Sequence, residues 1–208
     1  FAGEVDIRVI EEFRKQSIPV VLVNNYLDMD GLVCISADHY GGAVQATEYL
    51  CKLGHCKIGL LSGRFSPQVS EARIEGFVKT LAKYDIPVDD RFIADIEPAL
   101  EDGEEIMTRM LREVDRPTAF FCTNDTIAAG AMKAVTRAGL RVPEDIAIVG
   151  FDDSYISRVV EPELTTVRID AAKMGCLAMQ TLFDLIAGMP VEKAHIQIPT
   201  ELIVRGTA

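Results

Sequence analysis

The amino-acid sequence predicts an α/β protein with doubly wound parallel sheets, and three observations support this fold class. Short apolar runs, too short to form helices, alternate along the chain with segments that repeat apolar residues at helical spacing. The runs are unbroken, which is typical of parallel strands that are buried on both faces beneath helices. Polar residues follow the runs, most clearly at 146–153, where IAIVGFDD ends in Asp152 and Asp153.

Helix and strand segments follow one another in order from residue 3. The first helix stops before Pro19, and Gly54 ends the second. A small-residue helix later in the chain ends at Gly139 and Pro143. The predicted helices cover 3–16, 40–55, 69–87, 102–114, 126–143 and 171–188; the predicted strands cover 19–25, 57–63, 91–97, 118–125 and 146–153; LTTVRID (164–170) leads into the last helix, and HIQIP and ELIVRG are short closing strands.

These elements predict two lobes. Strands that begin at 57, 91, 118 and 146, with helices between them, form one doubly wound sheet. The first 36 residues hold one helix, one strand and the apolar stretch LVCIS, and a single strand leaves its edges unpaired. We therefore expect a second lobe whose first strands precede Phe1; alternatively, 1–36 packs on the same sheet. The expected N-terminal lobe comprises 1–36 and 169–190, and the C-terminal lobe 37–168 and 191–208.

Composition narrows the classes of function. No apolar run approaches ~18 residues, so no membrane span is expected. The formal net charge of −11 repels phosphate backbones, which disfavours DNA binding by this segment itself. The five cysteines form no CxxC pair and are expected as small core or half-buried residues in a reducing, cytoplasmic compartment; no leader is visible at Phe1.

No motif predicts catalysis. The sequence contains no nucleophile elbow, phosphate-binding loop, dinucleotide-binding turn or zinc-binding helix, and its three histidines are scattered. A catalytic interpretation would rest on Asp125, Asp152 and Asp153 alone. We therefore expect no enzymatic activity, no cofactor and no metal.

A ligand-binding interpretation fits the polar residues at the strand ends better. Carboxylates accept hydrogen bonds from neighbouring hydroxyls, an arginine donates to two adjacent oxygens, and an asparagine does both, so this set suits a polyhydroxylated ligand. An aromatic and an aliphatic side chain supply an apolar face for a ring. The candidate ligand-binding residues are Asn24, Phe65, Arg73, Ile96, Asn124 and Asp152.

Each candidate also has a purely structural alternative. Arg73 can pair with Glu71 or Glu75 instead of a ligand, and Asn124 or Asp125 can cap the helix that follows. The remaining alternatives are a turn for Asn24, packing for Phe65 and Ile96, and a helix cap for Asp153, which is the interpretation we favour for that residue.

Five segments together resemble the lactose-repressor/galactose-repressor (LacI/GalR) family of bacterial transcription regulators, and the resemblance covers essentially all 208 residues. It implies a periplasmic-binding-protein-like effector domain of two α/β lobes, joined by crossings near 35–38, 164–169 and 190–200, with a small molecule in the cleft between them. The segments are VPEDIAIVGFDD, PELTTVRIDAAKMG, FFCTNDTIAAGAMKAVTRAGLRVP, DHYGGAVQATEYLCKLGHCKIGLLSG and EARIEGF.

The resemblance also implies roles for single residues. The family's effector contacts carry over to Arg73 in ARIEGF, Asn124 in TND and Asp152 in GFDD. Asn24 stands where the family often has an aspartate, and Ile96 where some members have a ring-stacking aromatic residue.

The implied partners are a small-molecule effector, preferably a sugar, with a nucleoside or nucleobase as alternatives, a second copy of the chain and operator DNA. The DNA would be bound through a headpiece that would precede this chain. Helix 126–138 and segment 154–160 are candidates for the dimer contact. The alternative function is that of a periplasmic sugar-binding protein of a transport system.

Overall fold

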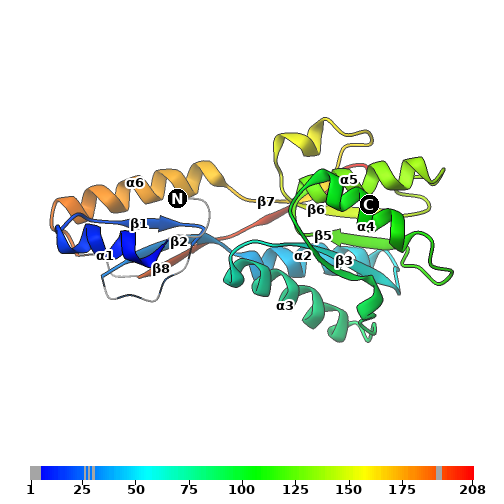
Figure 1. Cartoon of the computed structure of the whole chain (residues 1–208), viewed down its shortest axis with the longest axis horizontal. Coiled ribbons are helices and arrows are strands. Elements are labelled where there is room, and N and C mark those ends of the chain that lie inside the picture. The colour runs from blue at the N-terminus through cyan, green and yellow to red at the C-terminus, as the bar shows by residue number, and fades with distance from the viewer. Residues whose placement is uncertain (1–5, 26, 28, 30, 191–193) are drawn as a thin grey trace. The chain divides into compact units, whose positions relative to one another are not determined.

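The computed structural model describes residues 6–25, 27, 29, 31–190 and 194–208. The chain divides into two compact units, Phe1–Asp38 with Asp170–Pro199 and His39–Ile169 with Thr200–Ala208. Each unit contains its own sheet, in which the strands are mostly parallel. Both units alternate strands with helices, which confirms the predicted fold class (Figure 1).

The larger unit is built on a six-stranded sheet in the order β4-β3-β5-β6-β7-β9. The first five strands in this order run parallel, and β9 lies antiparallel to β7 at one edge. Its elements are α2 (His39–Lys52), β3 (Ile58–Gly63), α3 (Pro67–Lys83), the 3₁₀ helix η1 (Asp90–Phe92), β4 (Ile93–Ile96), α4 (Leu100–Met110), β5 (Ala119–Cys122), α5 (Asp125–Arg137), β6 (Ala147–Asp152), the 3₁₀ helix η2 (Tyr155–Arg158), β7 (Thr165–Arg168) and β9 (Glu201–Ile203).

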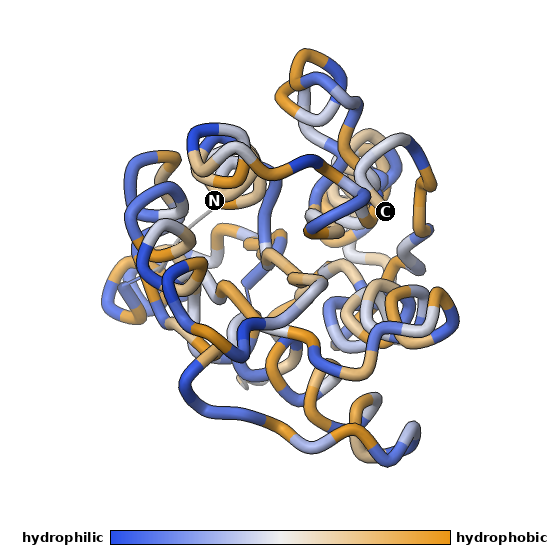
Figure 2. Tube along the Cα trace, turned by 90° about the vertical axis from the view of Figure 1, so that its right-hand side faces the viewer, coloured by the Kyte–Doolittle hydropathy of each residue, from blue (hydrophilic) through white to orange (hydrophobic). Residues whose placement is uncertain are grey.

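The strands of this sheet are apolar throughout because helices cover both faces. Neighbouring residues point to opposite sides: Leu60 and Phe121 pack with the core under α2 and α3, whereas Leu61 and Phe120 pack with the core under α4 and α5. Figure 1 shows these two helix pairs on opposite sides of the strands, and Figure 2 shows hydrophilic and hydrophobic residues alternating around the helices. The unbroken apolar runs in the sequence follow from this two-sided burial.

Helices α4 and α5 approach each other at glycines. A Cβ atom on Gly130 would overlap the carbonyl oxygen of Leu100, and one on Gly103 would lie 2.5 Å from the carbonyl oxygen of Ile127. The backbones of α4 and α5 are therefore in direct contact at these two glycines.

Gly130→Ala is expected to lower the free energy of unfolding by about 1–3 kcal/mol, because the added methyl group forces the two helices apart. Urea denaturation measures the change. The control is Gly175→Ala in α6, where no described atom lies within 4 Å of the added Cβ; it should be neutral or stabilise by up to about 1 kcal/mol. A Gly130 variant as stable as the wild type would contradict the close packing.

The smaller unit contains a three-stranded sheet in the order β1-β2-β8, in which both pairings are parallel. Its core includes Ile10, Leu22, Leu32 and Cys34. The sequence predicts one strand in the first 36 residues, but the LVCIS stretch forms a second, buried strand. The elements are α1 (Ile7–Lys15), β1 (Val21–Val23), β2 (Val33–Ala37), α6 (Ala171–Ile186) and β8 (His195–Ile198).

The two closing strands belong to different units. Strand β8 pairs with β2 from Cys34↔His195 to Ala37↔Ile198, so it completes the smaller sheet, whereas the sequence places 191–208 in the C-terminal lobe. The structure divides the chain after Asp38, Ile169 and Pro199, compared with the predicted divisions after residues 36, 168 and 190. The difference at the third position arises because β8 is paired by backbone hydrogen bonds that its residue types do not reveal.

The segment after β9 is anchored in the larger unit by Thr207, which is fully buried. Its hydroxyl donates to the carbonyl oxygen of Ile148 at 2.7 Å and accepts from the backbone N–H of Thr165 at 2.9 Å. Thr207 therefore ties the segment after β9 to this unit.

All five cysteines are free thiols. Cys34, Cys51 and Cys122 are buried as expected, whereas Cys56 and Cys176 are exposed, which neither a core nor a half-buried position predicts. Within the described ranges, no helix combines the length and the apolar composition that a membrane crossing requires.

Candidate functional site

Polar side chains gather at the carboxyl edge of the six-stranded sheet, around one buried arginine. Arg73 lies near the end of the second turn of α3 and is 3% exposed. Asn124 and Asp152 lie at the ends of β5 and β6, which are neighbours in the sheet. Carboxyl ends of parallel strands are where open α/β sheets bind ligands.

The guanidinium group of Arg73 is held by three acceptors. One terminal nitrogen donates to the carbonyl oxygen of Thr123; the other lies 3.3 Å from Asp152 Oδ1 and 3.2 Å from His39 Nδ1. The same group lies over the Phe151 ring, 3.9 Å from its centroid, and 5.0 Å from the centroid of Phe65. Arg73 pairs with a strand-end carboxylate, so the alternative pairing with a helix neighbour does not occur.

Asp152 ends strand β6 with φ +110°, a backbone conformation that non-glycine residues seldom adopt. Burial raises the pKa of its carboxyl group to about 6, although the charge of Arg73 acts in the opposite direction. Oxygen Oδ1 contacts Arg73, and a third of the side chain is still exposed. Asp152 is thus a carboxylate whose ionisation is sensitive to pH near neutrality.

Asn124 caps helix α5, because its Oδ1 accepts from the backbone N–H of Ile127 at 2.8 Å. Its amide nitrogen donates no hydrogen bond to any residue that the structure describes. The predicted helix cap is therefore present, and the amide nitrogen of the same side chain has no acceptor among the described residues.

The next residue, Asp125, has a structural role. It is 1% exposed, its Oδ1 accepts from the Thr166 hydroxyl, and its Oδ2 accepts from the backbone N–H of Ser154 at 2.6 Å. Burial raises the pKa of Asp125, and these two hydrogen bonds act against that change. The residue links the start of α5 to β7 and to the start of η2.

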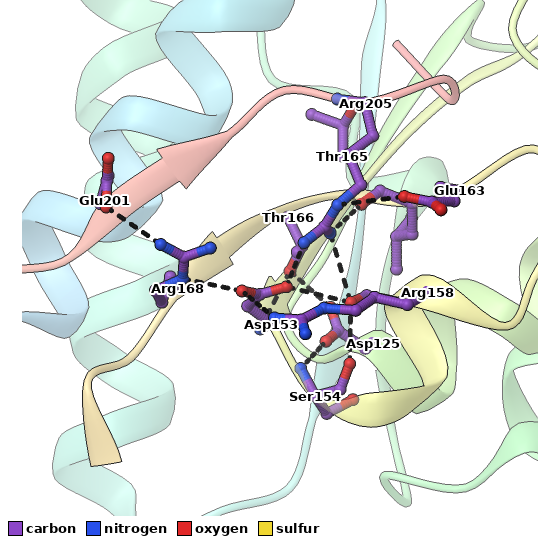
Figure 3. A network of polar contacts seen from close by, with 12 residues as sticks. Asp125, Asp153, Ser154, Arg158, Glu163, Thr165, Thr166, Arg168, Glu201 and Arg205 are labelled. Carbon is purple, nitrogen blue, oxygen red and sulfur yellow. Dashed lines mark hydrogen bonds and ion pairs between the residues drawn. The ribbon is translucent and has the colours of Figure 1, made fainter. Parts of the chain in front are cut away.

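Asp153 is held by arginines rather than serving as the predicted helix cap. Its side chain is 2% exposed and lies 2.5 Å from Arg205, 2.8 Å from Arg168 and 3.4 Å from Arg158 (Figure 3). Ser154 takes the cap position of η2. Burial alone would raise the pKa of Asp153, but the hydrogen bonds from Arg205 and Arg168 lower it to about 2. Figure 3 also shows Arg168 between Asp153 and Glu201.

The other predicted site residues have different surroundings. Phe65 lies in the loop after β3, where it contacts Arg73. Ile96 ends β4 and packs against the core under α4 and α5. Asn24 belongs to the smaller unit, has φ +51°, and accepts from the backbone N–H of Ala37 at 3.2 Å through Oδ1. Asn24 therefore has a structural contact with β2, and its contact with an effector stays a prediction.

Sequence reasoning missed His39, the first residue of α2, because no periodic or motif signal distinguishes it from the surface residues beside it. Its contact with Arg73 depends on how α2 packs against α3 and β6. Across the described part of the chain, no group of three or more His, Cys, Asp or Glu side chains is arranged to hold a metal ion.

Comparison with known proteins gives consistent matches. A family model described as a periplasmic binding protein-like domain matches residues 47–208. The probable HTH-type transcriptional repressor ExuR of Bacillus subtilis is 34% identical over 203 residues, which are 98% of this chain and 61% of that protein. The chain thus spans about three fifths of this curated relative.

Solved structures match over nearly the whole chain. A regulatory protein of the LacI family from Chloroflexus aggregans has a TM-score of 0.90 and 30% identity, and the match covers 100% of this chain and 74% of that one. A LacI family transcriptional regulator from Enterococcus faecium with bound ribose has a TM-score of 0.88 and 26% identity, covering 98% of this chain and 75% of that one. These relatives are named as regulators, and none of the three is named as a transport protein or an enzyme.

Proposed function

We propose that this chain, which belongs to the LacI family of regulators and has a periplasmic binding protein-like domain, binds a small-molecule effector at the carboxyl edge of the six-stranded sheet. The observation that carries this proposal is the buried Arg73 with Asp152 beside it and Asn124 on the neighbouring strand. A buried arginine is costly to desolvate, so its place at an accessible sheet edge indicates a functional requirement rather than a packing one.

The effector that fits this set best is a sugar or a related polyol. Asp152 accepts from hydroxyl groups, the unused amide nitrogen of Asn124 donates to them, and Arg73 donates to adjacent oxygens. The Enterococcus faecium relative with bound ribose supports this class. Phe65 and Ile96 supply apolar surface, and Asn24 is a further proposed contact.

We further propose that the effector controls a DNA-binding repressor. The acidic charge of this segment disfavours DNA contact by the segment itself, so the proposed DNA contact belongs to another part of the protein. The regulator that we propose is a cytoplasmic homodimer without catalytic activity. An effector shifts operator binding only through its different affinities for the two conformational states of the protein. The transport alternative has less support, because the relatives are regulators.

A binding panel tests the proposed function. The full-length protein is titrated calorimetrically with D-ribose, cellobiose, a uronic acid and a purine nucleoside, and its melting temperature is followed in parallel, since a ligand that binds the native state raises it. We expect at least one sugar to bind and to change operator affinity in a gel-shift assay. Binding of the nucleoside alone would overturn the sugar class, and no change in operator affinity with any bound compound would overturn effector control.

Effector affinity is expected to fall as the pH drops below about 6. The pKa of Asp152 is about 6, so the carboxylate is ionised and accepts hydroxyl hydrogen bonds above this pH, whereas its protonated form loses an acceptor below it. The decrease should approach tenfold per pH unit. Calorimetry at pH 5, 6, 7 and 8 measures it, and Asp152→Asn should remove the slope. The same slope in that variant would assign the titration to another group.

A further inference from the structure

A buried imidazole contacts the central arginine at the same terminal nitrogen as Asp152. His39 is 6% exposed, and its ring centroid lies 6.1 Å from that of Phe151. Its Nδ1 lies 3.2 Å from a terminal nitrogen of Arg73. Since a guanidinium group only donates hydrogen bonds, Nδ1 accepts, and the ring proton therefore resides on Nε2.

The imidazole is neutral across the physiological pH range. Burial lowers the pKa of His39 to about 3, and the positive charge of Arg73 lowers it further in the same direction. A protonated ring would lose its acceptor and repel the guanidinium. His39 thus presents Arg73 with a permanent acceptor that carries no charge.

This acceptor is one of three that orient the arginine. The carbonyl oxygen of Thr123 accepts a hydrogen bond from one terminal nitrogen, and Asp152 Oδ1 and His39 Nδ1 accept from the other, so both terminal nitrogens are engaged. Two buried N–H groups, Arg73 Nε and His39 Nε2, have no partner among the described residues. Without His39, that terminal nitrogen would keep Asp152 as its single acceptor, and the guanidinium plane would be held by the contacts with Thr123, Asp152 and the Phe151 ring alone.

We propose that His39 is a positioning residue for effector binding, whose Nδ1 fixes the guanidinium plane of Arg73 so that the arginine and Asp152 meet the effector in one geometry. The proposal rests on the proposed function for its effect on binding, whereas its effect on Arg73 is a property of the free protein. The two parts are measured separately.

The first measurement uses the free full-length protein. Long-range ¹H–¹⁵N correlation spectra should show His39 neutral with its proton on Nε2. The terminal N–H signals of Arg73 should be resolved, because hydrogen bonds slow rotation of the guanidinium nitrogens. His39→Asn keeps an acceptor at the position of Nδ1 and should preserve these signals, whereas His39→Leu should merge them. A proton on Nδ1, or resolved signals in the leucine variant, would overturn the proposal.

The second measurement uses D-ribose as the probe. His39→Leu should weaken ribose binding about tenfold, the loss expected for one hydrogen bond to a charged group, and His39→Asn should restore it to within about threefold of the wild type. Equal affinity in the leucine variant would overturn the positioning role. Equal loss in both variants would also contradict it, because it would indicate a packing role.

A matched control is His55→Leu at the amino end of the same sheet, where Nδ1 is hydrogen-bonded to Thr118 Oγ1 at 2.8 Å; it should leave ribose affinity unchanged. Thermal melts verify that each variant folds. If the wild type binds no ribose, the sugar proposal loses that probe, and the spectra of Arg73 alone decide the role of His39.

Discussion

Asp153→Ala is expected to lower the free energy of unfolding by about 3–5 kcal/mol, because it removes one partner of a buried ion-pair network. The carboxylate is 2% exposed and is the shared partner of Arg158, Arg168 and Arg205. Arg205, itself mostly buried, would be left with Glu163 at 3.6 Å as its remaining acidic partner. The three arginines would then repel one another across the space that the carboxylate had occupied. Guanidinium chloride denaturation at pH 7 measures the loss.

The pH dependence of stability provides an independent check. The pKa of Asp153 is about 2 in the folded protein, below its ordinary value of about 3.9. The stabilisation is therefore fully present above pH about 4 and is lost as the pH falls towards 2. Asp153→Asn should remove this part of the acid-induced decrease.

Asp145→Ala is the matched control, because the pKa of Asp145 is also about 2 but its partner Arg141 is mostly exposed. Its effect on stability should be much smaller, as for other surface ion pairs. Equal effects of the two substitutions would show that the arginines around Asp153 are not coupled through it.

Arg73→Lys is expected to weaken effector binding by at least about 100-fold, or about 3 kcal/mol, with the fold retained. A lysine ammonium group is a point charge, so it cannot engage Thr123, His39 and Asp152 together as the planar guanidinium does. It also loses the stacking over Phe151. The compound that binds in the panel is titrated into both proteins by calorimetry.

Arg64→Lys controls for the change of residue type. Arg64 lies in the loop just before α3, is mostly exposed, and pairs with Asp95 and Glu97. Its substitution should change affinity by less than about twofold, since it is a solvated surface pair. Asp152→Ala should weaken effector binding about as much as Arg73→Lys does. Unchanged affinity in both Arg73 and Asp152 variants would remove the sheet edge from the effector site.

The larger sheet could be predicted from the sequence because its strands are buried on both faces. The run at 57–63, for example, forms β3 at Ile58–Gly63, and the run at 146–153 forms β6 at Ala147–Asp152. Strand β8 was also predicted, from HIQIP, but the sheet that it joins was not. Its residues are largely exposed, and its place depends on pairing with β2, where His195 lies opposite Cys34, 161 positions earlier in the chain. The pattern of residue types within one segment does not reveal a pairing partner that lies so far away in the sequence.

The site shows the same limit. Asn124 and Asp152 were predictable as neighbours because each stands at the end of a strand that is visible in the sequence, and these strands are adjacent in the sheet. Arg73 reaches them from the second turn of α3, the helix that follows β3. Asp153 was assigned to the wrong partner, since its arginines come from η2, from β7 and from the segment after β9. His39 was missed for a related reason, because its value to the site lies entirely in a contact between two helices.

The anchoring of Thr207 has a consequence for biosynthesis. A ribosome delivers the chain from its N-terminus, and domains made of one continuous segment can fold as they emerge. Here the three-stranded sheet of the smaller unit is complete only when β8 (His195–Ile198) has been synthesised. The six-stranded sheet of the larger unit likewise requires β9 and Thr207. Neither unit can close until residues 195–208 have been translated, so the nascent chain must hold apolar strands such as β5 and β6 in an incomplete state. Premature termination just before this segment would therefore yield two unfinished units rather than one finished and one missing, and such a product would be a substrate for chaperones and proteases.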